Sequence, residues 1–198
     1  MSLFDTLKRA ALSALKREAR KAVDNAVSNI GKGRNYTEKF TFTALPANVE
    51  ELKALPEAKL DTAFKTAALT VLALSRYETD PEAAFEMLAF LKGPEALTNS
   101  EKSFIKDRFY EVDYVPRSYF NGSTPENDYN PPEPYTITVF DGPYSYQNEG
   151  YAKLFIRSGG ADNPREVLLR MTKDGKWYLW DQFLLPSIRE PHGANPWA

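Results

Sequence analysis

The sequence predicts an α+β fold, in which helices pack on one face of a mainly antiparallel sheet and a separate amphipathic helix precedes the domain. The first observation is the order of the patterns: one strand pattern is followed by helical patterns, a long loop and four further strand patterns. The second is an Asp174-Gly175 pair between two strand-forming runs, which indicates a hairpin and therefore antiparallel neighbours. Elements segregated in this way are typical of α+β domains and not of parallel nucleotide-binding sheets.

The chain divides into an N-terminal segment, residues 1–34, and a single α+β domain, residues 35–198. A length of 198 residues and a hydrophobic content of 42% suffice for one domain with its own core. Eight Lys and Arg against three Asp and Glu give residues 1–34 a charge of +5, so the remainder carries −7. The domain therefore has no overall attraction for nucleic acid.

Residues 2–30 have the periodicity of an amphipathic helix. Ser2 and Asp5 offer a capping-box start, and Gly31 offers a stop. Most cations lie outside the apolar stripe, although Lys8 lies within it. The residues that we expect to contact a membrane or a partner are Phe4, Leu7, Lys8, Leu15 and Lys16.

Three interpretations of this predicted helix are open at the level of sequence. It can pack on its own domain or pair with a second copy of the chain, because amphipathic helices usually bury their apolar face against protein. Its basic polar face and apolar tip also fit attachment to a membrane surface. Nucleic acid is the least favoured partner, since the segment offers few aromatic or base-reading side chains and no recognised binding motif.

Five elements are predicted between residues 36 and 110 from their apolar periodicity and from capping residues and prolines at their ends. The third has the widest apolar stripe, so we expect it to be the central, best-buried helix. In order, the elements are a strand over 36–43, a short helix over 49–55, a helix over 60–77, and helices that begin at Asp80-Pro81 and at Thr98.

Residues 116–134 form a predicted long loop rich in proline, turn residues and aromatics. Long loops in compact domains are uncommon and are often functional. We therefore single out Arg117, Tyr119, Phe120 and Tyr129 as candidate ligand-binding residues. The alternative interpretation is that the aromatic side chains only anchor the loop to the core.

The C-terminal part of the domain predicts a sheet with one apolar face. A two-residue Asp174-Gly175 loop sets the expected register of the last hairpin. In that register the core face carries the pairs Met171 with Tyr178, Leu169 with Trp180, and Val167 with Gln182. Trp177, Leu179 and Phe183 then fall on the opposite, mixed face, and Trp177 joins the candidate ligand-binding residues. The four predicted strands cover 135–140, 151–158, 166–173 and 176–184.

Composition removes several kinds of chemistry. The chain has no cysteine and one histidine, His192, which excludes thiol nucleophiles, cysteine-based zinc sites and multi-histidine metal sites. The carboxylates around the long loop match no calcium-binding spacing, and we interpret them as solvated. We therefore predict no catalytic residues and no cofactor, and favour a non-catalytic role over an enzyme. These carboxylates are Glu126, Asp128, Glu133 and Asp141.

Several long segments carry a resemblance to a known family. They are LPANVEELKALPEAKLDTAFKTAALTVLALSRYETDPEA, YVPRSYFNGSTPENDY, PYTITVFDGPYSYQNEGYAKLFIRSGGADNPR and WDQFLLPSIREP. Together they resemble an uncharacterised bacterial domain family, a domain of unknown function, over about Ala44 to Ala198. The resemblance implies no activity and no functional residues. Helices followed by a curved antiparallel sheet are also loosely similar to cystatin-like and NTF2-like folds.

The leading functional hypothesis is a non-catalytic binding or scaffolding module that residues 2–30 attach to a partner or a membrane surface. The alternative is a small-molecule or peptide-binding domain, or a carboxylate-dependent enzyme, with a pocket under the 116–134 loop. No apolar stretch approaches the ~20 residues that span a bilayer, and no secretory leader pattern is present. We therefore expect a cytoplasmic protein, with attachment to the membrane surface as an open alternative.

Overall fold

The computed structural model describes residues 36–110 and 112–194. These residues form four α-helices and five β-strands, which confirms the α+β class. None of the described helices is long and apolar enough to cross a membrane. The predicted N-terminal helix, with Phe4, Leu7, Lys8, Leu15 and Lys16, lies outside the described residues, so its role stays a prediction.

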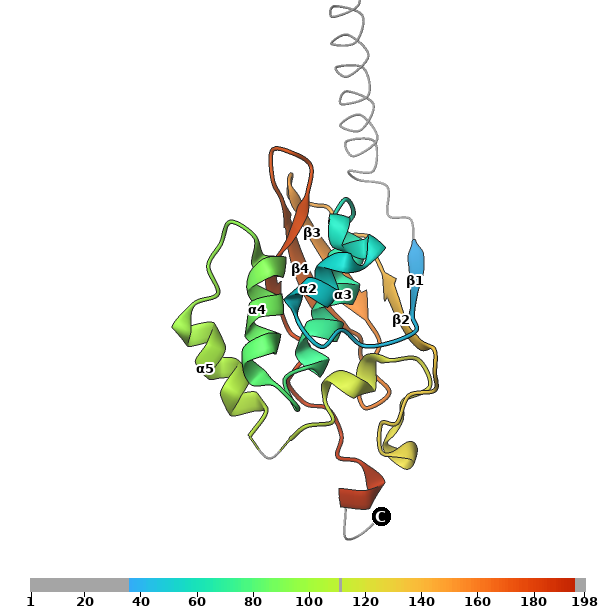
Figure 1. Cartoon of the computed structure of the whole chain (residues 1–198). Helices are drawn as coiled ribbons and strands as arrows, with labels where there is room; N and C mark the ends of the chain where they lie inside the picture. Colours follow the sequence, from blue (N-terminus) through green and yellow to red (C-terminus); the bar gives the residue numbers. More distant parts are fainter. Residues whose placement is uncertain (1–35, 111, 195–198) are drawn as a thin grey trace, which may run out of the picture.

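The five strands form one antiparallel sheet in the order β1-β2-β3-β4-β5 (Figure 1). Each strand pairs with its neighbours in this order, so the sheet is a meander whose first strand is separated from the second by the helices. The predicted N-terminal strand therefore joins the C-terminal sheet. The strands are β1 (Thr37–Phe42), β2 (Tyr135–Phe140), β3 (Tyr151–Ile156), β4 (Arg165–Met171) and β5 (Trp177–Gln182).

Three of the four described helices begin at caps that the sequence predicts, namely Asn48, Asp80 and Thr98, whose side chains accept hydrogen bonds from the first turn. The cap of α3, Thr62, accepts the Lys65 N–H and was not predicted. Figure 1 shows α2, α3 and α4 grouped in front of the sheet, with α5 at the margin of the domain. The helices are α2 (Val49–Ala54), α3 (Ala63–Ser75), α4 (Pro81–Lys92) and α5 (Asn99–Arg108).

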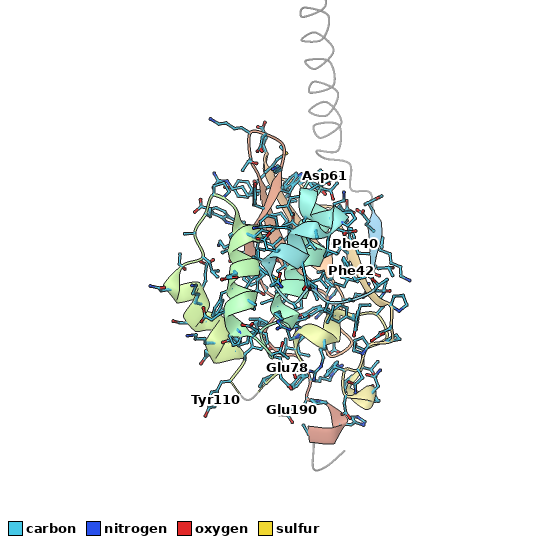
Figure 2. All side chains as sticks on the ribbon, viewed as in Figure 1. Phe40, Phe42, Asp61, Glu78, Tyr110 and Glu190 are labelled. Atoms are coloured by element: carbon cyan, nitrogen blue, oxygen red, sulfur yellow. The ribbon has the colours of Figure 1, made fainter. Side chains whose placement is uncertain are left out.

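Helix α3 is the centre of the core. All of its residues except Lys65 and Ser75 are buried, which is typical of a helix enclosed by protein on every side. It contacts all five strands as well as α4. On the sheet side, Phe40 and Phe42 project from β1 toward the helices (Figure 2). The prediction of a central helix is confirmed, although it begins and ends inside the predicted range of 60–77.

The hairpin between β4 and β5 differs from the sequence prediction. The Thr172 N–H donates to the Lys176 carbonyl over 2.8 Å, so three residues and not two form the loop. Gly175 has a φ of 83°, the left-handed conformation that a three-residue hairpin loop requires at this position. The predicted two-residue loop is therefore wrong. The loop consists of Lys173, Asp174 and Gly175, and Gly175 takes the left-handed position that ends such a loop.

A second irregularity restores the register farther down the hairpin. A bulge opposite the Leu168/Leu169 step makes Trp180 the additional residue of β5. Beyond the bulge, Val167 pairs with Gln182 as predicted. Between bulge and turn the register shifts by one residue. There Leu169 pairs with Leu179, and Met171 pairs with Trp177.

This shift changes which side chains face the core. Leu179 is buried beside Leu169, and the half-buried Trp177 packs against the same core. The prediction that both lie on the opposite, mixed face is therefore wrong, because one bulged residue reverses the faces of the residues before it. Phe183 remains exposed, as predicted for a residue outside the core.

The turn at Gly159-Gly160 packs tightly against the long loop. The Gly159 N–H donates to the Ser118 carbonyl over 2.9 Å, and a Cβ on Gly159 would lie 1.8 Å from the carbonyl oxygen of Ser123. A Cβ on Gly160 would lie 2.0 Å from the Tyr129 hydroxyl oxygen. These close contacts with the long loop require glycine at both positions, because a Cβ atom would collide with Ser123 or Tyr129.

We expect Gly159→Ala to lower the free energy of unfolding by about 2–3 kcal/mol, because the new methyl group would force backbone out of a packed loop. Gly142→Ala is the matched control. Its nearest neighbour would be the Phe155 ring at 3.4 Å, so we expect a change below about 1 kcal/mol. Urea denaturation measures both variants. Equal losses would contradict a specific close approach at Gly159.

Candidate binding surface

The structure buries the aromatic residues that the long loop offers as candidates. Tyr119, Phe120 and Tyr129 are exposed by only 1%, 2% and 0%. The Tyr119 hydroxyl donates to the carbonyl of Leu184, and the Tyr129 hydroxyl donates to the carbonyl of Arg189 over 2.8 Å. Burial raises the pKa of Tyr129 to about 12. These contacts favour the alternative interpretation, in which the aromatics anchor the loop.

Arg117 and Trp177 also make structural contacts. Arg117 pairs with Glu78 at 2.5 Å and with Asp113 at 3.7 Å, near the lower end of the domain, where Figure 2 labels Glu78. The ring of Trp177 packs edge-on against Tyr146, with centroids 6.4 Å apart. The five predicted site residues therefore do not converge on one cavity.

Two of the hollows in the described surface lie beside α5. The smaller, of about 50 Å³, lies between α4, α5 and β5 and is lined in part by Leu88 and Lys92. The larger, of about 240 Å³, is lined in part by Tyr110, Tyr114 and Ile188. The long loop lines neither of these hollows.

The carboxylates near the long loop act separately. Asp128 accepts the Gly193 N–H over 2.7 Å, and Asp141 accepts the Tyr36 N–H over 2.6 Å. Burial raises the pKa of Asp141, although the backbone hydrogen bond from Tyr36 opposes this. In residues 36–110 and 112–194, no group of three or more His, Asp or Glu side chains is arranged to hold a metal ion. Glu126 and Glu133 also lie apart from any such group.

One side of the sheet carries a concentrated set of aromatic and cationic side chains. We call it the outer face, because α2, α3 and α4 lie on the other side (Figure 1). The alternation of β3 shows the division: Ala152, Leu154 and Ile156 are buried, whereas the residues between them are not. The outer face is defined by Phe140, Tyr151, Lys153, Phe155, Arg157, Arg170 and Trp180.

The first part of the outer face is a stacked pair of phenylalanines. Phe140 and Phe155 are directly opposite on β2 and β3, with ring centroids 5.8 Å apart. The Arg157 guanidinium lies 5.3 Å from the Phe140 centroid, and the Lys153 ammonium lies 5.8 Å from the Phe155 centroid. Such contacts contribute about 0.5–1 kcal/mol each at exposed positions. They hold the cations in place over apolar rings.

The second part is centred on Arg170. Its guanidinium lies 4.8 Å from the Trp180 ring centroid and 5.4 Å from that of Tyr151. The two rings meet edge to face at 5.9 Å. Glu95 is 3.8 Å from Arg170, a weak pair between exposed groups. The bulge at Trp180 brings this ring onto the outer face, so the sequence-based register missed it.

The outer face offers two kinds of interaction at once. Its rings are half-buried flat surfaces, and its cations are held over them with part of their hydrogen-bonding capacity free. Among the described residues, Arg157 has no ion pair, whereas Lys153 pairs with Glu166 at 3.6 Å. The sequence placed Tyr151, Lys153, Phe155 and Arg157 on one side of a strand, which was the available signal for this surface. This chemistry suits an anionic surface with apolar character.

An ion pair supports the margin of the sheet at β5. Lys92 has a side chain exposed by only 8%; it contacts the carboxylate of Glu101 and donates to the Trp180 carbonyl over 3.3 Å. Burial disfavours the charged form of Glu101, but hydrogen bonds from Lys92 and Thr98 outweigh it and hold the pKa of this carboxyl below its ordinary value. The pair therefore fixes α4 and α5 against β5.

Comparison with protein families finds a match over most of the chain. The model of a family described as a domain of unknown function, DUF6935, matches residues 44–192. The resemblance to an uncharacterised domain family is thereby confirmed. Comparison with curated proteins and with solved structures finds no match, so the looser similarity to cystatin-like or NTF2-like folds stays a prediction.

The Lys92–Glu101 pair predicts a pH-dependent stability. Because the folded pKa of Glu101 is lowered, its contribution is complete above the unfolded pKa near 4.5 and is lost as pH falls through the folded value. We expect Glu101→Gln to lower the free energy of unfolding by about 1–2 kcal/mol at pH 7, and by less near pH 3.

Glu95→Gln is the matched control, since Glu95 lies in the connection just before α5 and the substitution removes an exposed ion pair with Arg170. We expect it to change stability by less than about 0.5 kcal/mol at either pH. Denaturation at pH 7 and pH 3 measures all three proteins. A Glu101→Gln effect that is independent of pH would contradict the assignment.

Proposed function

Because this chain belongs to the DUF6935 family, whose function is unknown, we propose its function from its own surfaces: it is a non-catalytic binding module for an anionic membrane surface. The outer face would contact the lipid headgroups, and residues 2–30 would provide a second attachment. The observation that carries the proposal is the set of cations held over aromatic rings on a sheet face that no described helix covers.

The chemistry of the outer face supports this proposal. Lys and Arg near an anionic lipid surface contribute about 1 kcal/mol each. Aromatic side chains with polar edges favour the headgroup region, where one part is apolar and the other is hydrated. Arg157 and Arg170 combine both properties because each lies over a ring.

The sequence of the N-terminal segment supports the same partner. Residues 1–34 carry +5, and the predicted helix has Phe4, Leu7 and Leu15 in its apolar stripe. Two weak attachments on one chain bind more tightly than either alone, because the second forms at high effective concentration. The lack of cysteine fits a reducing compartment, so we propose the cytoplasmic side of a membrane.

The outer face predicts a specific loss of vesicle binding. We expect the double variant Arg157→Ala, Arg170→Ala to bind vesicles of 30% phosphatidylserine and 70% phosphatidylcholine about 10- to 30-fold more weakly, since each cation contributes about 1 kcal/mol. Co-sedimentation measures the partition. Lys106→Ala is the control, because Lys106 is exposed on α5, away from this face. Equal losses in both proteins would indicate a non-specific charge effect and contradict the proposal.

The N-terminal segment predicts a second, separable loss. We expect Leu7→Asp to weaken binding to the same vesicles at least about tenfold, because it places a charge within the predicted apolar stripe. Thr6→Asp is the matched control: it introduces the same charge on the opposite side of the predicted helix. It should retain most of the binding. Losses of equal size would show attraction by charge alone, and no loss in either would remove this segment from the proposal.

A further inference from the structure

The two edges of the sheet differ in a way that points to a second binding surface. At β5, the Trp177 N–H donates to the Leu60 carbonyl over 2.8 Å, and the Thr66 hydroxyl donates to the Trp177 carbonyl over 2.7 Å. The Lys92 ammonium donates to the Trp180 carbonyl. The β5 edge is therefore occupied by the chain itself. At β1, no described element lies beyond the strand (Figure 1).

We propose that β1 accepts an acidic, extended segment of a partner protein, which adds to the sheet as a sixth strand. The inference does not depend on the proposed membrane function, since it concerns the backbone edge and not the outer face as a whole. Strand addition of this kind draws its affinity from main-chain hydrogen bonds and its specificity from alternate side chains.

The backbone of β1 leaves a regular row of free groups. The Tyr36 carbonyl accepts a hydrogen bond from the Asp141 N–H over 3.0 Å. Because hydrogen bonding alternates along an antiparallel pair, the N–H and C=O groups of Glu38, Phe40 and Phe42 also point toward β2. The N–H and C=O groups of the residues between them point away from the sheet. These are Thr37, Lys39 and Thr41, and no described residue hydrogen-bonds to their backbone.

Two of the devices that protect an edge strand, a bulge and a proline, are absent from β1, which carries one lysine on this edge. All six residues pair with β2 in an unbroken register, without a bulge or a proline. Threonine at two of the three outward positions favours strand pairing. Lys39 is the only charged residue among the three, so it sets the charge that a sixth strand must accommodate.

Charge selects the side chains of the incoming strand. On the outer face, Lys39 is opposite Thr138, which the register of β2 and β3 places opposite Arg157. The two cations therefore lie in one row, about 10 Å apart across two strand spacings. Neither has an ion pair with a described residue. An Asp or Glu opposite Lys39 would complete this row.

The other side of the incoming strand meets different chemistry. Burial raises the pKa of Glu38; the Lys65 ammonium opposes this, whereas the carboxylates of Asp61 and Glu57 add to it. Phe40 and Phe42 face this side and are buried. Acidic side chains are disfavoured here, whereas apolar ones extend the core. The partner segment that fits both sides alternates acidic and apolar residues.

Two other occupants of the β1 edge, a second copy of the chain and the N-terminal segment of the same chain, are less compatible with these charges. A second copy paired about the centre of β1 would place Lys39 opposite its own counterpart, which like charges disfavour. The N-terminal segment of the same chain carries +5 and would meet Lys39 and Arg157 with like charge. An acidic segment from another protein matches this edge.

A pair of synthetic peptides tests the proposal. The probe is an acetylated, amidated octapeptide in which glutamate and valine alternate, and its control replaces every glutamate with lysine. With full-length protein in fluorescence anisotropy, we expect the glutamate peptide to bind at least about tenfold more tightly. Lys39→Glu should reverse this preference. Equal binding of both peptides, or a preference unchanged by Lys39→Glu, would overturn the proposal.

Backbone methylation provides a test that leaves the protein unaltered. A residue opposite Lys39 directs its N–H toward β1, so N-methylation of the glutamates should abolish binding, whereas N-methylation of the valines should change it by less than about threefold. Amide exchange should show new protection at Thr37, Lys39 and Thr41 on peptide addition. Protection already present without peptide would assign the edge to residues 1–34, or to a second copy if it rises with protein concentration; either result would overturn the proposal.

Discussion

The burial of α3 is the constraint on which the rest of the structure depends. Its residues are enclosed on nearly every side, so they can be covered only if a sheet lies on one side and further helices lie on the other. All five strands of the sheet contact α3. This requirement brings β1 next to β2 although more than ninety residues of sequence separate them.

Covering α3 uses one face of the sheet and leaves the other without a helix. Stacked rings and cations make that second face compatible with water, because the charged groups lie over apolar surfaces that would otherwise be exposed. The same arrangement supplies the binding chemistry that we propose. Solubility and recognition therefore depend on the same side chains, including Arg157 and Arg170.

The sheet edges follow from the same packing. At β5, Thr66 of α3 and Lys92 of α4 donate hydrogen bonds to backbone carbonyls of the strand, but no described helix extends past β1. A chain that needed only stability would gain from closing both edges. The open edge carries a short, regular strand with one cation, a combination that permits pairing by a complementary segment.

Sequence patterns predicted the elements well because their signals are local. Caps such as Asn48 and Asp80 act through hydrogen bonds within one turn, and the alternation of Ala152, Leu154 and Ile156 marks the buried face of one strand. The pairing of Val167 with Gln182 was predicted for the same reason. These features determined the α+β class and the existence of the last hairpin.

The candidate site was predicted less well because it depends on contacts between distant segments. In the sequence, Tyr119 and Tyr129 resemble exposed loop aromatics. In the structure both are buried, and their hydroxyls donate hydrogen bonds to the carbonyls of Leu184 and Arg189. The bulge at Trp180 has no local signal, since it arises where the three-residue turn and the pairing of Val167 must both be satisfied. By itself the sequence determined which segments become helices and strands; tertiary structure alone decided which aromatic rings are buried, because burial depends on partners that the fold brings together.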